Sequence, residues 1–239
     1  AIASAMGTAI VPSLISDFVT GKLNEVKDRI GTVVKFNMIV AMPCAAGLIA
    51  LAGPILQLLF GDTNQISANM LQIGGICVVF FALSTVTNGV LQGINRMSLP
   101  VIHSAISLLV HIPLLYILLR FTDLNSYALV ICNCIFPLVV CILNAFSIKK
   151  HIGYKQEIKR TFVLPAIASV IMGVIAFGTY KLTEFTGNSI ACIISILVAI
   201  PVYFILLIKL GAVTEAELKA MPKGWLLVKI FKKTHIMNK

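Results

Sequence analysis

The side chains best able to do chemistry in this sequence lie within long apolar segments. Thr85, Asn88, Gln92 and Arg96 follow one another at spacings of three, four and four residues, which places them on one face of a helix. Such a row can line a water-filled path, and its arginine can donate two hydrogen bonds to a phosphate at once. The same amides can instead hold two helices together across a membrane interface. Both interpretations stay open from the sequence.

A second polar row is expected in the segment 100–120. His103, Ser104, Ser107 and His111 fall within an arc of about 100° on a helix. His111 would lie near the middle of the segment, where an imidazole facing a cavity can gain or lose a proton near neutral pH. The alternative is a buried hydrogen-bonding histidine that only holds helices together.

Asn133 and Asn144 stand eleven residues apart in the segment 124–147, which is three helical turns and predicts a shared face. Pro137 lies between them and removes a backbone hydrogen bond. Membrane helices tolerate such prolines where a neighbour satisfies the freed carbonyl. The candidate substrate-cavity residues are Asn88, Gln92, Arg96, His103, Ser107, His111 and Asn133.

Patterns typical of catalysis or metal binding are missing from the sequence. It contains no HExxH, GxSxG or Walker pattern. Cys132 and Cys134 would point about 200° apart on a helix, and no histidine stands at a ligand spacing nearby. We therefore interpret all six cysteines as small apolar filler. We expect no enzyme activity, no metal and no cofactor.

The composition predicts the elements that position these residues. Hydrophobic residues make up 59% of the 239 and charged residues 12%, with a mean hydropathy of +0.99, whereas soluble domains carry about 25% charged residues. The apolar residues form blocks near the length of about 20 that crosses a bilayer as a helix. We predict an all-α bundle of seven membrane-spanning segments: 1–18 (truncated), 36–60, 70–94, 100–120, 124–147, 162–182 and 189–210. The second is expected to break near Leu51, before Gly53 and Pro54, and to continue as a short outer helix to Phe60.

The basic residues predict the orientation of the chain. Alternating seven spans places seventeen of the nineteen lysines and arginines on the side of the C-terminus, and Arg120 and Lys181 on the other. Because basic residues are enriched on the cytoplasmic side, we expect a multi-pass protein of the cytoplasmic membrane with a cytoplasmic C-terminus. The net charge of +10 then indicates anionic membrane lipids as partners, not nucleic acid.

The chain is expected to have three parts. Residues 1–148 would form most of a transport lobe, 149–211 two additional spans, and 212–239 a basic amphipathic tail. In the tail, Thr214 and Glu217 have the spacing of a capping box and predict a helix from Glu215. Pro222 would end it, and a short basic helix would follow at the level of the lipid headgroups.

Four stretches of the sequence resemble the multidrug/oligosaccharidyl-lipid/polysaccharide exporter superfamily. The branch they resemble most is the polysaccharide biosynthesis or stage V sporulation protein B flippases. The stretches are 8–16 (TAIVPSLIS), 52–61 (AGPILQLLFG), 87–96 (TNGVLQGINR, followed by Pro100) and 211–218 (GAVTEAEL, followed by Pro222). Their order and spacing cover nearly the whole chain.

The resemblance implies a MATE-like parent of fourteen helices, of which this chain would be helices 8 to 14. Two helical lobes would surround a cavity that opens alternately to each side of the membrane. The implied cargo is an undecaprenyl-diphosphate-linked saccharide, such as the peptidoglycan precursor lipid II. Two alternatives stay open: a cation-coupled multidrug exporter on the same fold, and a non-transporting scaffold that recruits cell-wall synthesis enzymes.

Overall fold

The computed structural model describes residues 2–213, with side chains from residue 11 onwards. The helix expected from Glu215 and the basic stretch after Pro222 lie outside the described residues. The described part is helical and contains no strand. Its elements are α1 (Ile2–Val19), α2 (Leu23–Ala50), α3 (Ala52–Phe60), α4 (Gln65–Gly93), α5 (Ser98–Phe121), α6 (Ser126–Ile152), the π-helical turn η1 (Lys159–Val163), α7 (Leu164–Thr183), the 3-10 turn η2 (Glu184–Thr186) and α8 (Asn188–Lys209).

Six helical segments of the described chain are long and apolar enough to cross a membrane. They are α2, α4, α5, α6, the continuous stretch from η1 through α7 to η2, and α8. This confirms the prediction of a polytopic helical bundle, and α1 occupies the place of the truncated first span. The break near Leu51 is also confirmed, because α2 ends at Ala50 and the short helix α3 follows.

Helix α2 begins earlier than the sequence indicated, at Leu23 and not at position 36. Its added turns carry charged residues, but Val26, Ile30 and Val34 recur every four residues and are buried. These three side chains pack with residues of α4 in one apolar cluster. A search for wholly apolar segments misses such a stretch, because only one face of the helix is apolar.

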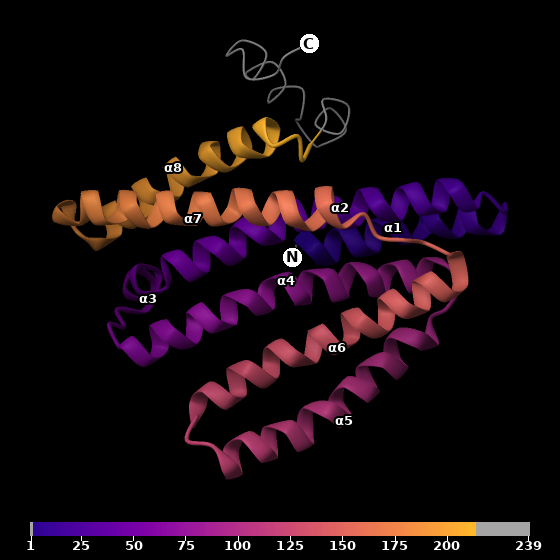
Figure 1. Cartoon of the computed structure of the whole chain (residues 1–239), viewed down its shortest axis with the longest axis horizontal. Coiled ribbons are helices and arrows are strands. Elements are labelled where there is room, and N and C mark those ends of the chain that lie inside the picture. Colours follow the sequence, from indigo (N-terminus) through magenta and orange to yellow (C-terminus); the bar gives the residue numbers. More distant parts are fainter. Residues whose placement is uncertain (1, 214–239) are drawn as a thin grey trace.

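The helices run back and forth between two ends of an elongated bundle (Figure 1). Helix α2 lies between α4 on one side and α7 on the other, and α5 is outermost, packed mainly on α6. The turn 20–22 and the connections 94–97 and 153–158 meet at one end, with the basic residues beside them. Arg120 and Lys181 lie at the opposite end, in the last turns of α5 and α7.

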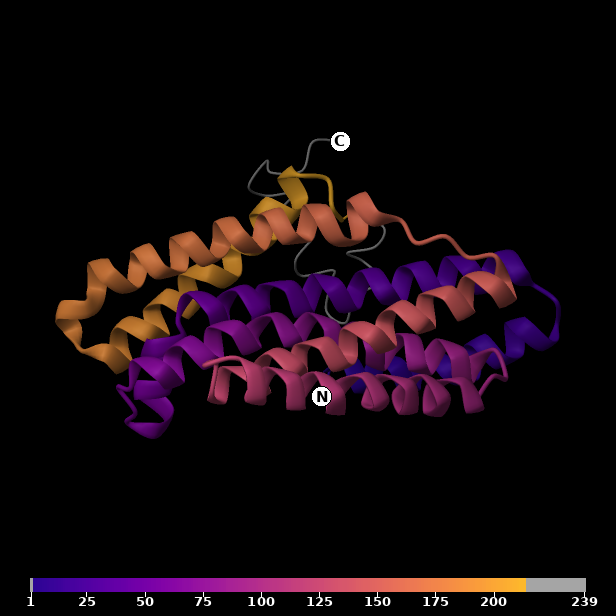
Figure 2. The same ribbon diagram turned by 60° about the horizontal axis from the view of Figure 1, so that its bottom comes forward.

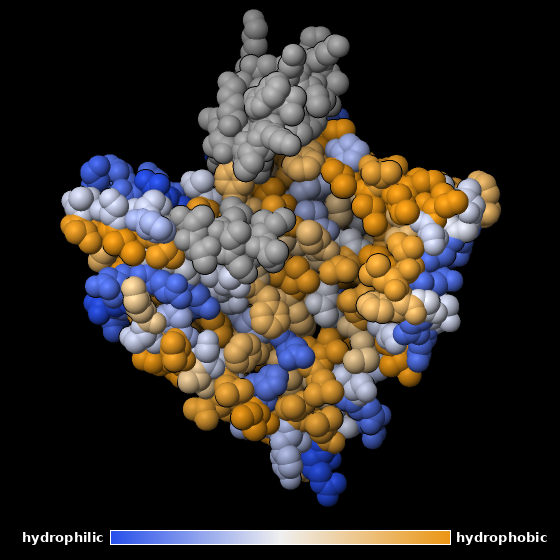
Figure 3. Space-filling view, turned by 180° about the vertical axis from the view of Figure 1, so that it is seen from behind, coloured by the Kyte–Doolittle hydropathy of each residue, from blue (hydrophilic) through white to orange (hydrophobic). Residues whose placement is uncertain are grey.

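The surface of the bundle has the distribution that a membrane demands. Figure 3 shows apolar side chains across the middle of one face and hydrophilic ones towards its two ends. Turning the ribbon brings α5 and α6 to the front and shows the same elongated arrangement (Figure 2). The arrangement fits helices that span a bilayer with their connections in water.

A disulfide between α4 and α6 corrects the interpretation of the cysteines. Cys77 and Cys134 are bonded, with a Cα–Cα distance of 4.6 Å across 57 residues of sequence. The prediction of apolar filler is therefore wrong for these two. Cys132, Cys141 and Cys192 are free and buried, and Cys44 is free and exposed. The pairing was not predictable, because it depends on how α4 and α6 pack.

Candidate functional site

A chain of polar side chains joins α4, α5 and α6, and we call it the polar seam. It consists of Thr87, Asn88, His103, Asn144 and Ser147. Nδ1 of His103 lies 2.7 Å from Oδ1 of Asn144, and Oγ of Ser147 lies 3.2 Å from Nε2 of His103. Nδ2 of Asn144 donates to Oγ1 of Thr87 at 2.9 Å and to Oδ1 of Asn88 at 2.8 Å.

Asn144 fixes the direction of every hydrogen bond in the polar seam. Its amide nitrogen supplies both donors to α4, so its Oδ1 has to accept from His103. Nδ1 of His103 therefore carries a hydrogen, and Nε2 accepts from the hydroxyl of Ser147. Asn144 is 0% exposed, and all three of its donor and acceptor groups have partners. These hydrogen bonds connect α4, α5 and α6, and they leave no group of the buried Asn144 amide without a partner.

Ser107 and His111 continue the contact between α5 and α6 beyond the polar seam. The hydroxyl of Ser107 donates to the carbonyl of Phe136 at 2.7 Å, and Nδ1 of His111 lies 3.1 Å from the carbonyl oxygen of Cys132. A carbonyl only accepts, so Nδ1 of His111 carries the hydrogen. The ring of His111 also meets Phe136 edge-on, with centroids 6.1 Å apart. This is the geometry of histidine and serine holding two helices together.

The polar row on α4 divides between two environments. Asn88 is half-buried in the polar seam, whereas Gln92 and Arg96 are exposed towards the basic end. Thr85 donates to the carbonyl of Phe81 in its own helix. Gly93 packs against α1, where an added Cβ would lie only 2.8 Å from Cβ of Leu14. The absence of a side chain at Gly93 therefore lets α1 and α4 approach closely.

Asn133 and Asn144 differ in burial despite their helical spacing. Asn133 is exposed, and Asn144 lies where α6 packs against both α4 and α5. The shared face predicted from their spacing therefore does not give these two residues the same burial. Spacing places two residues on one side of a helix, but the neighbouring helices decide which of them is covered.

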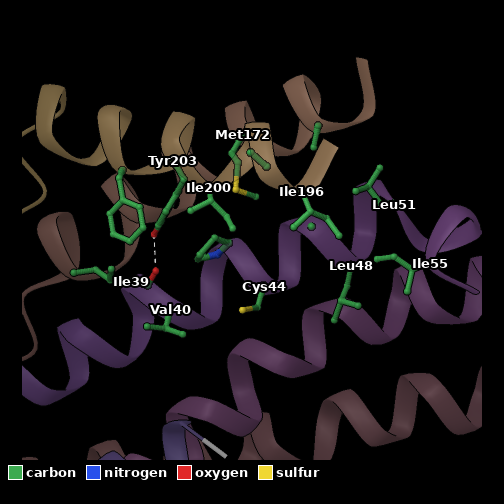
Figure 4. Close-up of a pocket in the computed structure, with 15 residues that line it drawn as sticks. Ile39, Val40, Cys44, Leu48, Leu51, Ile55, Met172, Ile196, Ile200 and Tyr203 are labelled. Carbon is green, nitrogen blue, oxygen red and sulfur yellow. Dashed lines mark hydrogen bonds between the residues drawn. The ribbon is translucent and has the colours of Figure 1, made fainter. Parts of the chain in front are cut away.

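A large apolar pocket lies between α2, α7 and α8 (Figure 4). Its volume is about 590 Å³. Apart from the thiol of Cys44 and the hydroxyl of Tyr203, the side chains that line it carry only hydrocarbon groups or a thioether. The lining residues include Ile39, Val40, Cys44, Leu48, Leu51, Ile55, Met172, Ile196, Ile200 and Tyr203.

Small residues create the apolar pocket. Gly47 of α2 lines it, and a Cβ added there would meet no atom within 4 Å. Ala176 and Ala199 face it from α7 and α8. Helices α2 and α8 each pack against α7, and the small side chains between them leave a space.

A proline in α2 explains the single hydrogen bond in the apolar pocket. Pro43 has no N–H, so the carbonyl of Ile39, four residues earlier, loses its helical partner. The hydroxyl of Tyr203 donates to that carbonyl at 2.8 Å (Figure 4). This confirms at Pro43 the expectation that a neighbouring helix satisfies a carbonyl freed by proline.

Comparison with known proteins shows what this chain is similar to. Residues 1–117 match the family described as MatE. The lipid II flippase MurJ of Bacillus subtilis (strain 168) is 25% identical over 178 residues, which cover 72% of this chain and 32% of the relative. The probable lipid II flippase MurJ of Bdellovibrio bacteriovorus is 29% identical over 225 residues, which cover 88% of this chain and 42% of the relative. These similarities are consistent with a member of the multidrug/oligosaccharidyl-lipid/polysaccharide exporter superfamily.

The chain spans about a third to two fifths of the length of these curated relatives. No solved structure matches it. Six helical segments long and apolar enough to span a membrane, together with the similarity to the MurJ relatives, indicate a multi-pass membrane protein.

Sequence reasoning missed two features of the candidate site. Asn144, the centre of the polar seam, was noticed only for its spacing from Asn133. The apolar pocket had a weak signal in the small residues Gly47, Ala176 and Ala199, but small residues are common in membrane helices. Within residues 2–213, no three histidine, cysteine or acidic side chains gather as metal ligands would.

Proposed function

We propose that this chain is the C-terminal part of a flippase that moves a lipid-linked saccharide across the cytoplasmic membrane. The observation that carries the proposal is the similarity to two relatives that are named as lipid II flippases or probable ones and that align with most of this chain. The expected cargo class is a polyprenyl-diphosphate saccharide. The step is transport by alternating access, without a covalent reaction.

The physical problem of such a cargo is its two unlike ends. A diphosphate-saccharide headgroup cannot cross hydrocarbon unaided, because burying its charges is prohibitive. The polyprenyl chain, in contrast, needs only an apolar surface. The apolar pocket between α2, α7 and α8 offers such a surface at membrane depth, which supports a lipid as the transported molecule.

The exposed polar residues are the proposed contacts for the headgroup. Gln92 and Arg96 are exposed near the end of α4, and a guanidinium matches a phosphate with paired hydrogen bonds. Asn88 and Asn133 would extend this polar surface. In this proposal the packing of α5 on α6 is stabilised by His103, Ser107 and His111, because each of them has a hydrogen-bond partner on α6.

The proposed orientation has the C-terminus in the cytoplasm. Nine of the thirteen basic residues between positions 2 and 213 lie in, or within seven residues of, the turn 20–22 and the connections 94–97 and 153–158 at one end of the bundle. Enrichment of lysine and arginine marks the cytoplasmic side of membrane proteins. Arg96 would then lie close to the cytoplasmic leaflet, where the lipid-linked precursor is loaded.

The test is translocation of a fluorescent undecaprenyl-diphosphate saccharide by the full-length protein in proteoliposomes. Transport above that of empty vesicles is expected. Arg96→Gln should reduce it at least tenfold, whereas Arg120→Gln, at the opposite end, should change it less than twofold. The isolated chain 1–239 should not transport, because half of a cavity cannot alternate. Absence of transport by folded full-length protein would overturn the proposal.

A cation-coupled multidrug exporter is the second candidate, favoured by the match to the MatE family. Efflux of organic cations from the same proteoliposomes, without saccharide transport, would support it. A scaffold for cell-wall synthesis enzymes is separated by deleting residues 212–239. The deletion should abolish a scaffold function and leave a flippase with substantial transport.

A further inference from the structure

A second cavity lies at the basic end of the bundle, beside the connection 153–158 between α6 and α7, and we call it the basic cavity. Its volume is about 340 Å³. Helices α2, α4 and α6 form its walls, with apolar side chains that include Ile30, Val34, Leu83 and Ile148. Its place at the end of the spanning helices is the level of lipid headgroups.

An unpartnered donor lies in the wall of the basic cavity. The hydroxyl of Tyr154 donates to Oε1 of Gln156 at 3.1 Å. Burial, and secondarily the charge of Glu157, raise the pKa of Tyr154 to about 12, so the hydroxyl keeps its proton. Nε2 of Gln156 is buried and has no hydrogen-bond partner among the described residues. A buried amide nitrogen without an acceptor is unfavourable. An acceptor oxygen bound in this cavity would therefore satisfy Nε2 of Gln156.

The charge around the basic cavity is strongly positive. Lys149 and Lys155 line it, and neither forms an ion pair within the described residues. Glu157 is the only acidic residue between positions 149 and 160, and it pairs with Arg160 at 3.8 Å. An occupant that satisfies both the amide and the lysines therefore has to be an anion with oxygen acceptors.

We propose that the basic cavity binds the headgroup phosphate of an anionic phospholipid, with part of an acyl chain against its apolar walls. Phosphate oxygens would accept from Nε2 of Gln156 and from the ammonium groups of Lys149 and Lys155. The apolar walls favour a lipid over a free phosphate ion, because a small anion leaves them uncovered. The chain's own segment 214–239 is a poor occupant, because it carries six lysines and only two glutamates. The site would anchor the bundle to the cytoplasmic leaflet.

The experiment is native mass spectrometry of the full-length protein purified in detergent and incubated with defined lipids. Phosphatidylglycerol should bind in preference to phosphatidylcholine with the same acyl chains. The double variant Lys149→Gln/Lys155→Gln should weaken phosphatidylglycerol binding about tenfold, since each basic residue near a membrane contributes to attraction of anionic lipid. The matched control Lys150→Gln/Lys159→Gln removes the same charge outside the basic cavity, and its effect should stay below twofold.

A second variant tests the amide separately from charge. Gln156→Leu keeps the net charge and a similar volume, and it should weaken phosphatidylglycerol binding about threefold without lowering the melting temperature. Glycerol phosphate, which lacks acyl chains, should bind far more weakly than phosphatidylglycerol. Equal losses in the two double variants, equal binding of both lipids, or glycerol phosphate binding as tightly as phosphatidylglycerol would each overturn the proposal. None of these outcomes depends on transport.

Discussion

The polar seam and the apolar pocket use opposite means to hold helices together. In the polar seam, Asn144 and His103 place each donor opposite an acceptor across three helices. Around the apolar pocket, α2, α7 and α8 touch through alkyl groups, and Tyr203 supplies one hydrogen bond. In a bilayer, apolar contacts between helices are little better than contacts with lipid. The polar seam therefore fixes the relative positions of α4, α5 and α6. Around the apolar pocket, contacts between helices can be replaced by contacts with lipid at a small cost in free energy.

This contrast indicates which part of the bundle is rigid and which part can open to bind a ligand. A network of directional bonds has few alternative arrangements, because partial satisfaction leaves a buried polar group unpaired. A space lined by hydrocarbon imposes no such condition. The three-helix unit α4–α5–α6 is thus the expected frame of the lobe, and the side facing α7 and α8 is the expected place of change.

Asn144→Ala should break the polar seam and has the largest expected effect on stability. It removes two donors and one acceptor at once and leaves His103 and Asn88 without their partner. The expected cost is about 1–3 kcal/mol in the free energy of unfolding. A thermal melt of the protein in detergent measures it. Asn133→Ala, on the exposed side of the same helix, is the control and should change stability by less than about 0.5 kcal/mol. Equal losses of stability in Asn144→Ala and Asn133→Ala would show that the polar seam does not hold the three helices together.

Two glycines sharpen the comparison because the same substitution should act with opposite sign. At Gly75 of α4 an added Cβ would lie 2.6 Å from Cγ1 of Ile49 and 3.3 Å from the carbonyl of Ala45. Gly75→Ala should therefore destabilise by about 1–2 kcal/mol. At Gly47, in the apolar pocket, the Cβ meets open space, so Gly47→Ala should stabilise α2 by up to about 1 kcal/mol. Paired melts check the signs, and a stabilised Gly75→Ala would contradict the packing of α2 on α4.

Tyr203→Phe removes the hydrogen bond in the apolar pocket and should cost about 1 kcal/mol. Its loss leaves the carbonyl of Ile39 without a partner beside Pro43. The double variant Tyr203→Phe/Pro43→Ala should recover most of that stability, because an alanine in place of the proline supplies the missing backbone N–H. Additive losses of stability in this double-mutant cycle would show that the hydrogen bond of Tyr203 does not depend on Pro43.

Thiol labelling distinguishes the two regions without changing stability. Cys44 is free and exposed in the apolar pocket, while Cys132 and Cys141 are free and buried and Cys77 is bonded to Cys134. An uncharged maleimide should modify Cys44 first in the folded, unreduced protein. Peptide mass spectrometry reads the order, and early modification of Cys77 or Cys134 would disprove the disulfide.

The sequence foretold those parts of the fold that depend on composition along one segment. Apolar blocks gave the spans, and Gly53 with Pro54 marked the break after Ala50. The start of α2 at Leu23 was not predicted, because the apolar residues Val26 and Ile30 lie on only one face of an otherwise charged stretch. Polar positions 88, 103, 107 and 111 were singled out from their spacing, but their hydrogen-bond partners on α6 were not foreseeable. The pairing of Cys77 with Cys134 and the volume of the apolar pocket depend on distances between helices, which no single segment encodes.

The bond between Tyr203 and Ile39 also bears on how the protein is made. Its two residues are separated by 164 positions, so α2 leaves the ribosome long before α8 exists. Until then the carbonyl freed by Pro43 has to find water or another donor, because hydrocarbon offers none. Insertion of α8 therefore completes the backbone hydrogen bonding of the earlier helix α2. A truncation that removes α8 should trap the nascent protein in a form that quality-control proteases recognise.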